Sequence, residues 1–109
     1  MLNKNEKDKQ DLFQILRKIY IRSYATQREL SSDLGFSLGK INYCLRLLRE
    51  KGLVKLKNFK NQNNKIKYLR YVLTTKGISE RTRLTVNFMR KKMEEYDQLK
   101  KELKNKHIK

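Results

Sequence analysis

The chain opens with apolar residues spaced as on one face of a helix. Between residues 9 and 22 they recur every three or four positions, and most of the intervening positions are polar. This period predicts an amphipathic helix, because side chains three and four positions apart share one face. The residues expected to face the core are Leu12, Leu16, Ile19 and Tyr20.

Two shorter helices with their own start and stop signals are expected next. Thr26 and Glu29 form a capping box, in which each side chain binds the backbone amide of the other residue, and Gly35 supplies a left-handed stop. Ser37 can cap a further helix that ends before Gly52. Two capped helices joined by a short turn indicate a helix-turn-helix, which presents the outer face of its second helix to the DNA major groove. The apolar stripes of these helices are Leu30 and Leu34, then Leu38, Ile41, Leu45 and Leu48.

The hydrophobic pattern changes after residue 52. Residues 53–59 and 66–73 are rich in β-branched, aromatic and alternating residues, which predicts two strands. Residues 60–65 between them are polar and amide-rich, and asparagine tolerates the left-handed backbone of a turn, so they are expected to form a hairpin tip. Three helices followed by a hairpin make a winged helix-turn-helix, a mainly α fold with one small β-hairpin.

From residue 75 the pattern is helical again, to about residue 104. A helix of about 30 residues is ~45 Å long, more than one small domain can cover. Leu84, Phe88 and Leu99 are expected to pack on the domain body, and residues 104–109 are expected to fray. The main apolar stripe has heptad-like spacing, with Lys100 at one position, and is expected to pair two copies of the chain. It comprises Val86, Met89, Met93, Tyr96 and Leu103.

This pattern divides the chain into two functional parts. Residues 1–76 are expected to form the DNA-binding domain, and residues 77–109 a dimerisation helix with a frayed basic tail. The 109 residues leave room for one compact domain beside that helix.

The charge of the chain indicates a polyanionic partner. Lys and Arg number 28 against 11 Asp and Glu, so the formal net charge is +17, which attracts nucleic acid or an anionic membrane. No apolar run approaches the ~18 residues of a membrane-spanning helix, and the first residues lack the apolar segment of a secretory signal. One cysteine cannot form an internal disulfide, which fits a reducing cytosol. A cytoplasmic protein with no membrane partner is expected.

The outer face of the third helix is the first candidate site. Its arginine and lysine can donate to guanine, its asparagine can pair with adenine, and its tyrosine can reach a phosphate or a thymine methyl group. The helix N-terminus favours a phosphate. An ordinary solvated helix face is the alternative, and the net charge and the adjacent hairpin favour DNA over it. The candidate residues are Ser37, Lys40, Asn42, Tyr43 and Arg46.

The hairpin is the second candidate site. Residues 53–76 carry seven basic residues and no acidic one. Lysines can protect edge strands from aggregation, but that role would account for only one or two of the seven basic residues. Contact with the DNA backbone or the minor groove is the favoured role. The wing residues expected to make it are Lys60, Lys65 and Lys67.

The sequence contains no recognisable catalytic or metal site. The single histidine, His107, lies in the expected tail, and no Gly-rich loop, nucleophile elbow or Cys/His cluster is present. Cys44 is expected to be buried as a small hydrophobe, although an oxidation switch beside the reading face is the alternative. A protein without enzymatic activity and without a cofactor is expected.

The motifs together resemble the MarR-like winged-helix transcriptional regulators of bacteria. The similarity covers about residues 12–100. It is carried by Thr26-Gln27-Arg28-Glu29-Leu30, by residues 41–54 and by Leu73-Thr74-x-Lys76-Gly77. Residues 34–45 resemble the short subgroup associated with exopolysaccharide gene clusters.

The resemblance implies a dimer that binds palindromic duplex DNA. Typical members carry an Asp-x-Arg pair in the wing, where Lys65 and Lys67 stand here, and a longer N-terminal dimerisation segment. Sensing of a small molecule is therefore not expected to carry over from the family.

Two other functions remain open on the sequence. The winged helix can bind RNA or nucleic acid without sequence preference, because a fold does not determine its ligand. The basic C-terminal helix can also dock on a protein partner or an anionic membrane surface.

Overall fold

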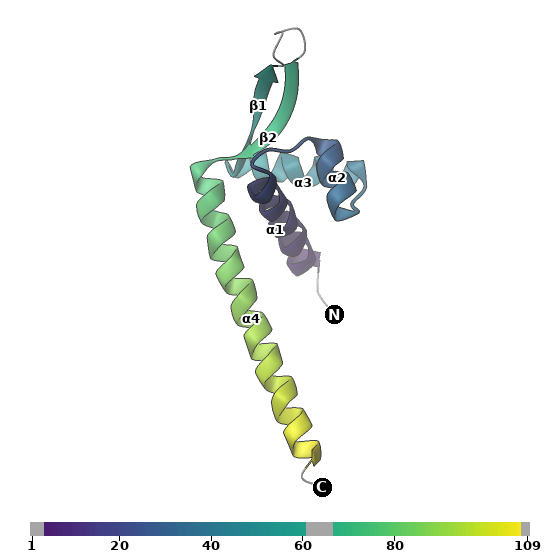
Figure 1. Cartoon of the computed structure of the whole chain (residues 1–109), viewed down its shortest axis with the longest axis vertical. Helices are drawn as coiled ribbons and strands as arrows, with labels where there is room; N and C mark the ends of the chain where they lie inside the picture. The colour runs from purple at the N-terminus through teal and green to yellow at the C-terminus, as the bar shows by residue number, and fades with distance from the viewer. Residues whose placement is uncertain (1–3, 61–66, 108–109) are drawn as a thin grey trace.

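The computed structural model describes residues 4–60 and 67–107, and it has the expected winged helix-turn-helix architecture. Three helices form a compact body, a two-stranded hairpin projects from one end, and a long last helix runs past the body in the opposite direction (Figure 1). The elements are α1 (Lys4–Arg22), α2 (Gln27–Leu34), α3 (Leu38–Glu50), β1 (Val54–Lys60), β2 (Lys67–Leu73) and α4 (Thr75–His107).

The two short helices begin and end at the expected capping residues. The Glu29 amide donates to the Thr26 hydroxyl at 3.1 Å, and the Thr26 amide donates to the Glu29 carboxylate at 2.8 Å, which completes the capping box. Gly35 ends α2 with φ of 70°, in the left-handed region that glycine enters without strain. The Ser37 hydroxyl accepts from the Lys40 amide at 3.1 Å and caps α3. These local hydrogen bonds confirm the helix-turn-helix.

The core lies where α1, α2, α3 and the base of the hairpin meet. Its buried side chains include Ile15, Leu16, Ile19, Ala25, Leu30, Ile41, Cys44, Leu45, Leu48, Leu53 and Val54. Two side chains expected in the core are on the surface instead: Tyr20 is 47% exposed and Leu38 is 45% exposed. Tyr20 lies at the edge of the buried face of α1, with its ring beneath the Arg81 guanidinium. Leu38 occupies the first turn of α3, ahead of the turns that reach the core.

The hairpin is attached to the body by a short backbone bridge. β1 and β2 pair antiparallel, with Val54 opposite Leu73 and Lys60 opposite Lys67. Ala25 exchanges both backbone hydrogen bonds with Tyr71, at 3.0 and 2.7 Å, and so ties the segment before α2 to β2. Residues 61–66, which include most of the expected hairpin tip, lie outside the described residues.

The start of α4 packs closely on the end of the helix-turn-helix. The Gly77 amide donates to the Thr74 hydroxyl, which donates to the carbonyl of Gly52 at 2.6 Å. A Cβ atom at position 77 would lie 1.9 Å from the Leu53 carbonyl oxygen, so only glycine fits there. This contact sets the angle at which α4 leaves the hairpin.

α4 extends well beyond the body, and the described chain measures 72 × 26 × 25 Å along its principal axes (Figure 1). Leu84 packs against the core, and the Phe88 ring stacks on Phe13 with centroids 4.7 Å apart, as expected. The expectation for Leu99 is wrong: it is 63% exposed, because the helix has left the body by that point. Fraying from residue 104 is also wrong for residues 104–107, which are helical.

Candidate nucleic-acid interface

The outer face of α3 presents hydrogen-bonding side chains to solvent. Asn42 and Arg46 are exposed and Tyr43 is 44% exposed, because the opposite face of the helix is buried in the core. The Arg46 guanidinium lies 5.9 Å from the centre of the Tyr43 ring, a distance at which cation and ring attract. The structure therefore brings Asn42, Tyr43 and Arg46 together on one surface.

Lys40 lies on a different flank of α3. Its ammonium group is 3.0 Å from the Asp11 carboxylate of α1 and 4.0 Å from the centre of the Phe36 ring. It therefore ties α3 to α1 and does not stand beside Asn42 and Arg46. The Ser37 hydroxyl is already occupied by the Lys40 amide, although Ser37 remains exposed at the helix N-terminus.

Three basic residues of the wing lie on one face of the hairpin. Strand alternation places Lys55, Lys57 and Arg70 on the face opposite the buried Val54, with Lys57 directly across from Arg70. Lys55 and Lys57 are exposed. Of the predicted wing residues, Lys60 and Lys67 form the last described strand pair, with side chains outside the described part, and Lys65 lies outside it altogether.

A charged network that sequence reasoning missed holds α2 against α1 and the wing. Arg22 at the end of α1 binds Asp33 at 2.6 Å and Glu29 at 3.0 Å, and Arg70 of the wing reaches Glu29 at 3.9 Å. The Arg70 guanidinium also lies 4.8 Å from the Tyr24 ring centre. The capping box identified Glu29, but its partners are far away in sequence, so spacing alone could not find them.

This network holds its carboxylates in the ionised form. The backbone hydrogen bond from Thr26 is the main cause that lowers the pKa of Glu29, and Arg22 and Arg70 lower it further. The hydrogen bond from Arg22 is the main cause that lowers the pKa of Asp33. The position of the wing relative to α2 therefore depends on charged groups.

Cys44 is buried, as the sequence predicts. Its side chain is 4% exposed, and burial raises the pKa of its thiol, which disfavours the thiolate that oxidation requires. His107 ends α4 and its side chain is not described. Among residues 4–60 and 67–107, no three His, Cys, Asp or Glu side chains are placed to share a metal ion. No described helix is long and apolar enough to cross a membrane.

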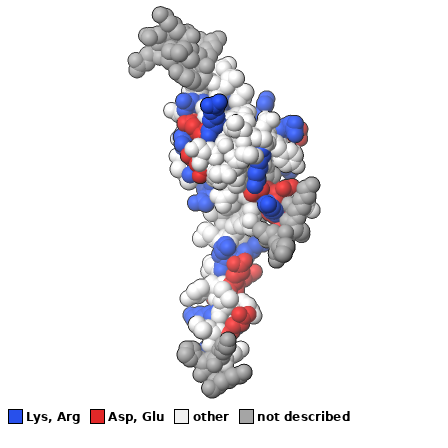
Figure 2. Space-filling view, turned by 90° about the vertical axis from the view of Figure 1, so that its right-hand side faces the viewer, with Lys and Arg blue, Asp and Glu red and all other residues white. Residues whose placement is uncertain are grey.

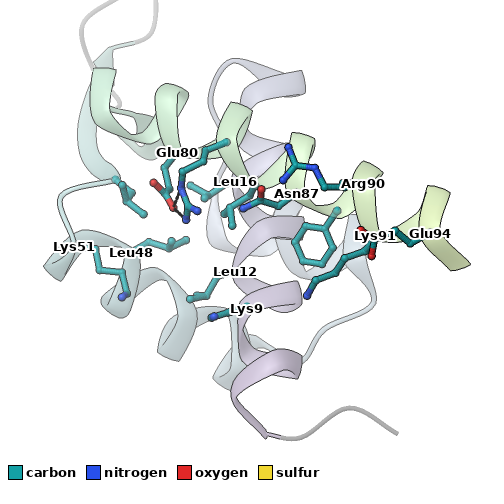
Figure 3. Close-up of a pocket in the computed structure, with 14 residues that line it drawn as sticks. Lys9, Leu12, Leu16, Leu48, Lys51, Glu80, Asn87, Arg90, Lys91 and Glu94 are labelled. Carbon is teal, nitrogen blue, oxygen red and sulfur yellow. Dashed lines mark hydrogen bonds and ion pairs between the residues drawn. The ribbon is translucent and has the colours of Figure 1, made fainter.

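A groove of about 440 Å³ lies between α1, the end of α3 and α4 (Figure 3). Leu12, Leu16 and Leu48 lie on its inner wall. Its rim is charged and includes the Glu80–Arg83 ion pair, drawn with dashed lines. The hydrogen bond from Arg83 is the main cause that lowers the pKa of Glu80. The sequence pattern did not predict this groove, because its walls come from separate helices.

The apolar stripe of α4 is exposed along its whole length. Its members are Val86, Met89, Met93, Tyr96 and Leu103, with exposed fractions of 48%, 58%, 64%, 63% and 64%. On the face seen in Figure 2, basic and acidic side chains are interspersed over the body, and acidic side chains recur along the projecting part of α4.

Comparison with known domains identifies the helix-turn-helix part of the chain. A family model described as a winged helix-turn-helix, DNA-binding, matches residues 12–55, from α1 to the first residues of β1. This is a class of DNA-binding domain and not of catalytic domain. No curated protein sequence matches the chain.

Solved structures of MarR proteins share the fold. A mutant MarR from E. coli is 29% identical with a TM-score of 0.56, over 67% of this chain and 52% of that one. A mutant E. coli MarR in complex with operator DNA is 30% identical with a TM-score of 0.52, over 63% of this chain and 47% of that one. A mutant of Lactococcus lactis ZitR in the apo form, at 17% identity and a TM-score of 0.56, covers 86% of this chain and 64% of its own and shows the fold alone.

The chain thus contains a winged-helix DNA-binding domain similar to that of MarR, and it spans about half the length of the E. coli proteins it matches. These matches support a MarR-like fold. They give no support to the narrower resemblance to regulators associated with exopolysaccharide gene clusters.

Proposed function

We propose that this protein is a transcriptional regulator that binds palindromic double-stranded DNA as a dimer, with α3 in the major groove and the wing on the backbone or in the minor groove. The observation that carries the proposal is the exposed set of Asn42, Tyr43 and Arg46 on the outer face of a capped, well-buried helix. The net charge of +17 supplies the general attraction to DNA.

Base recognition is assigned to two of these side chains. Arg46 has the paired donors that match O6 and N7 of guanine, and Asn42 has the donor and acceptor that match adenine. Tyr43 supports the Arg46 guanidinium with its ring and offers a hydroxyl to a phosphate or its ring to a thymine methyl group. Lys40 is not assigned to base recognition, because it forms an ion pair with Asp11. Ser37, at the N-terminus of α3, is proposed to contact a phosphate.

The wing is proposed to bind through charge. Residues 53–76 contain seven basic and no acidic residues, and Lys55 and Lys57 are exposed on one face of β1. Lys60, Lys65 and Lys67 add three more basic residues to the wing in the sequence, and phosphate contact is proposed for them too. Contacts of this kind hold the duplex in place without reading its sequence.

Two copies are proposed to act together, paired by the apolar stripe of α4. A twofold pair of reading helices matches a palindromic site. The complex of E. coli MarR with operator DNA, at 30% identity, supports the duplex as ligand. The resemblance to bacterial regulators favours action in the cytoplasm, where the DNA is.

The test is a titration of the full chain against three ligands of equal length: an inverted-repeat duplex selected from random sequences, a scrambled duplex and a duplex RNA. Preference for the selected duplex is expected. Arg46→Ala should remove most of that preference, whereas Arg17→Ala, which deletes the same charge from an exposed position of α1, should not. Equal affinity for all three ligands would instead indicate a general nucleic-acid binder.

A further inference from the structure

The chain has four glycines, and the fold explains three of them. Gly35 follows α2 and Gly52 follows the end of α3, with φ of 70° and 75°, in the left-handed region where other residues are strained. Gly77 lies against the Leu53 carbonyl, which leaves no room for a Cβ atom. At each of these positions a larger residue would disturb the folded chain itself.

Gly39 is the glycine for which the folded chain gives no such reason. It lies in the first turn of α3, and its φ is not in the left-handed region. Apart from its two chain neighbours and the nearby backbone of α3, the closest atom to an added Cβ would be the Ser37 hydroxyl oxygen, at 4.0 Å. Alanine would therefore fit, and it favours a helix more than glycine does. Within the described part of the protein, neither space nor backbone conformation requires glycine here.

Gly39 lies on the face of α3 that carries the side chains assigned to base recognition. Positions 39, 42, 43 and 46 recur every three or four residues, which is the spacing of one helix face, and all four are exposed. The opposite face, with Ile41 and Leu45, is buried. The Lys40 ammonium group is held 3.0 Å from Asp11, on another flank. The first turn of the reading face therefore exposes helix backbone where a side chain would otherwise stand.

We propose that the edge of a DNA base pair packs directly against the backbone of α3 at Gly39. This role rests on the proposed function, in which α3 enters the major groove. A helix with its side chains is about 10–12 Å across and the groove is about 12 Å wide, so one missing side chain affects how closely the helix approaches the bases. Gly39 then sets the depth to which α3 inserts, and that depth brings Asn42 and Arg46 within reach of their bases.

A phosphate of the DNA backbone is the competing neighbour for Gly39. The base edge is favoured because Gly39 is in line with Asn42 and Arg46, and because the N-terminal residues of a reading helix are those that contact base edges. The two neighbours also differ in their consequences. A phosphate is present in every duplex, whereas a base edge is approached closely only when α3 is fully inserted at its specific site.

Gly39→Ala tests this contact by adding a single methyl group. Binding to the selected inverted-repeat duplex should weaken about tenfold or more, because a methyl group forced into a packed contact pushes the two surfaces apart. Binding to scrambled DNA should change little, because attraction to the phosphates does not require close approach to the bases. The melting temperature should stay the same or rise, so unfolding cannot explain the loss of affinity.

A larger residue gives a second measurement. Gly39→Leu should weaken binding to the selected duplex by about a hundredfold or more, since leucine also favours a helix but adds a longer side chain. Gln98→Leu is the control, because it places the same apolar side chain at an exposed position of α4, away from the reading face. It should bind the selected duplex as the wild type does.

Three results would overturn the proposed contact. If Gly39→Ala binds the selected duplex as tightly as the wild type, no base pair packs on Gly39. If the affinities for the selected and scrambled duplexes fall equally, the neighbour of Gly39 is a phosphate. A failure of the proposed function is recognised separately, from the wild type alone: a wild type without preference for the selected duplex would refute specific recognition, and the contact at Gly39 with it.

Discussion

Gly77 provides the sharpest test of how α4 is joined to the body. An added methyl group at this position would lie 1.9 Å from the Leu53 carbonyl oxygen and 2.9 Å from its carbon. Both atoms belong to the backbone and cannot rotate away, so either α4 or the segment after α3 must shift. The same carbonyl accepts the Thr74 amide at 3.0 Å, and that hydrogen bond would lengthen too.

The expected decrease in stability for Gly77→Ala is about 2–4 kcal/mol. Forcing a methyl group into a packed site costs about 1–3 kcal/mol, and weakening a backbone hydrogen bond adds about 1 kcal/mol. A chain of this length has an unfolding entropy of roughly 0.2 kcal/mol per degree, so the melting temperature should fall by about 10–20 °C.

Thermal unfolding followed by circular dichroism in the far ultraviolet measures this decrease. Gly39→Ala is the matched control, because its nearest neighbour is the Ser37 hydroxyl oxygen at 4.0 Å and alanine favours a helix. It should leave stability unchanged or raise it by up to about 1 kcal/mol. If Gly77→Ala has the same melting temperature as the wild type, then α4 lies farther from Leu53 than the structure shows and leaves the body at a different angle.

Four further outcomes are expected. In titrations, Arg46→Ala and Asn42→Ala should each weaken binding to the selected duplex by about 1–3 kcal/mol, and binding to scrambled DNA by less. Equal losses on both duplexes would indicate that the two side chains bind only phosphate. Replacing three wing lysines with Gln should weaken binding to every duplex. Binding curves at several salt concentrations should also show a shallower slope of log affinity against log salt concentration, by roughly one unit for each phosphate that is no longer neutralised. These lysines are Lys60, Lys65 and Lys67. Met93→Glu should split the dimer in sedimentation at micromolar concentration and leave half-site binding intact, and a mutant that stays dimeric would contradict the α4 stripe as the interface. Folding lowers the pKa of Glu29 below its ordinary value of 4.5. The ionised side chain therefore stabilises the fold above pH 4.5, and this stabilisation disappears as the pH falls through the lower pKa of the folded state. The difference in unfolding free energy between the wild type and Glu29→Gln, measured by urea unfolding, should be largest near neutral pH and shrink in acid.

Local sequence signals suffice to predict the order of the elements and the ends of the two short helices. The Thr26–Glu29 capping box, the Gly35 stop and the Ser37 cap are all made within four residues of the chain. The change of apolar period after Gly52 separates helices from strands in the same local way. Interactions of such short range depend little on the rest of the molecule, which is why the winged helix could be predicted from the sequence alone.

Which side of each element meets which neighbour depends on packing between segments that are distant in sequence. Lys40 and Arg46 are both basic residues of α3, but Lys40 forms an ion pair with Asp11 and Arg46 does not. The reason is that α1 packs beside the flank of α3 that carries Lys40. Leu99 resembles Leu84 in sequence, but α4 has left the body before it reaches Leu99. Contacts between distant segments depend on the angle between packed helices, and that angle is set by the whole core and by close approaches such as that of Gly77 to Leu53. The spacing of residues along the chain does not encode this angle.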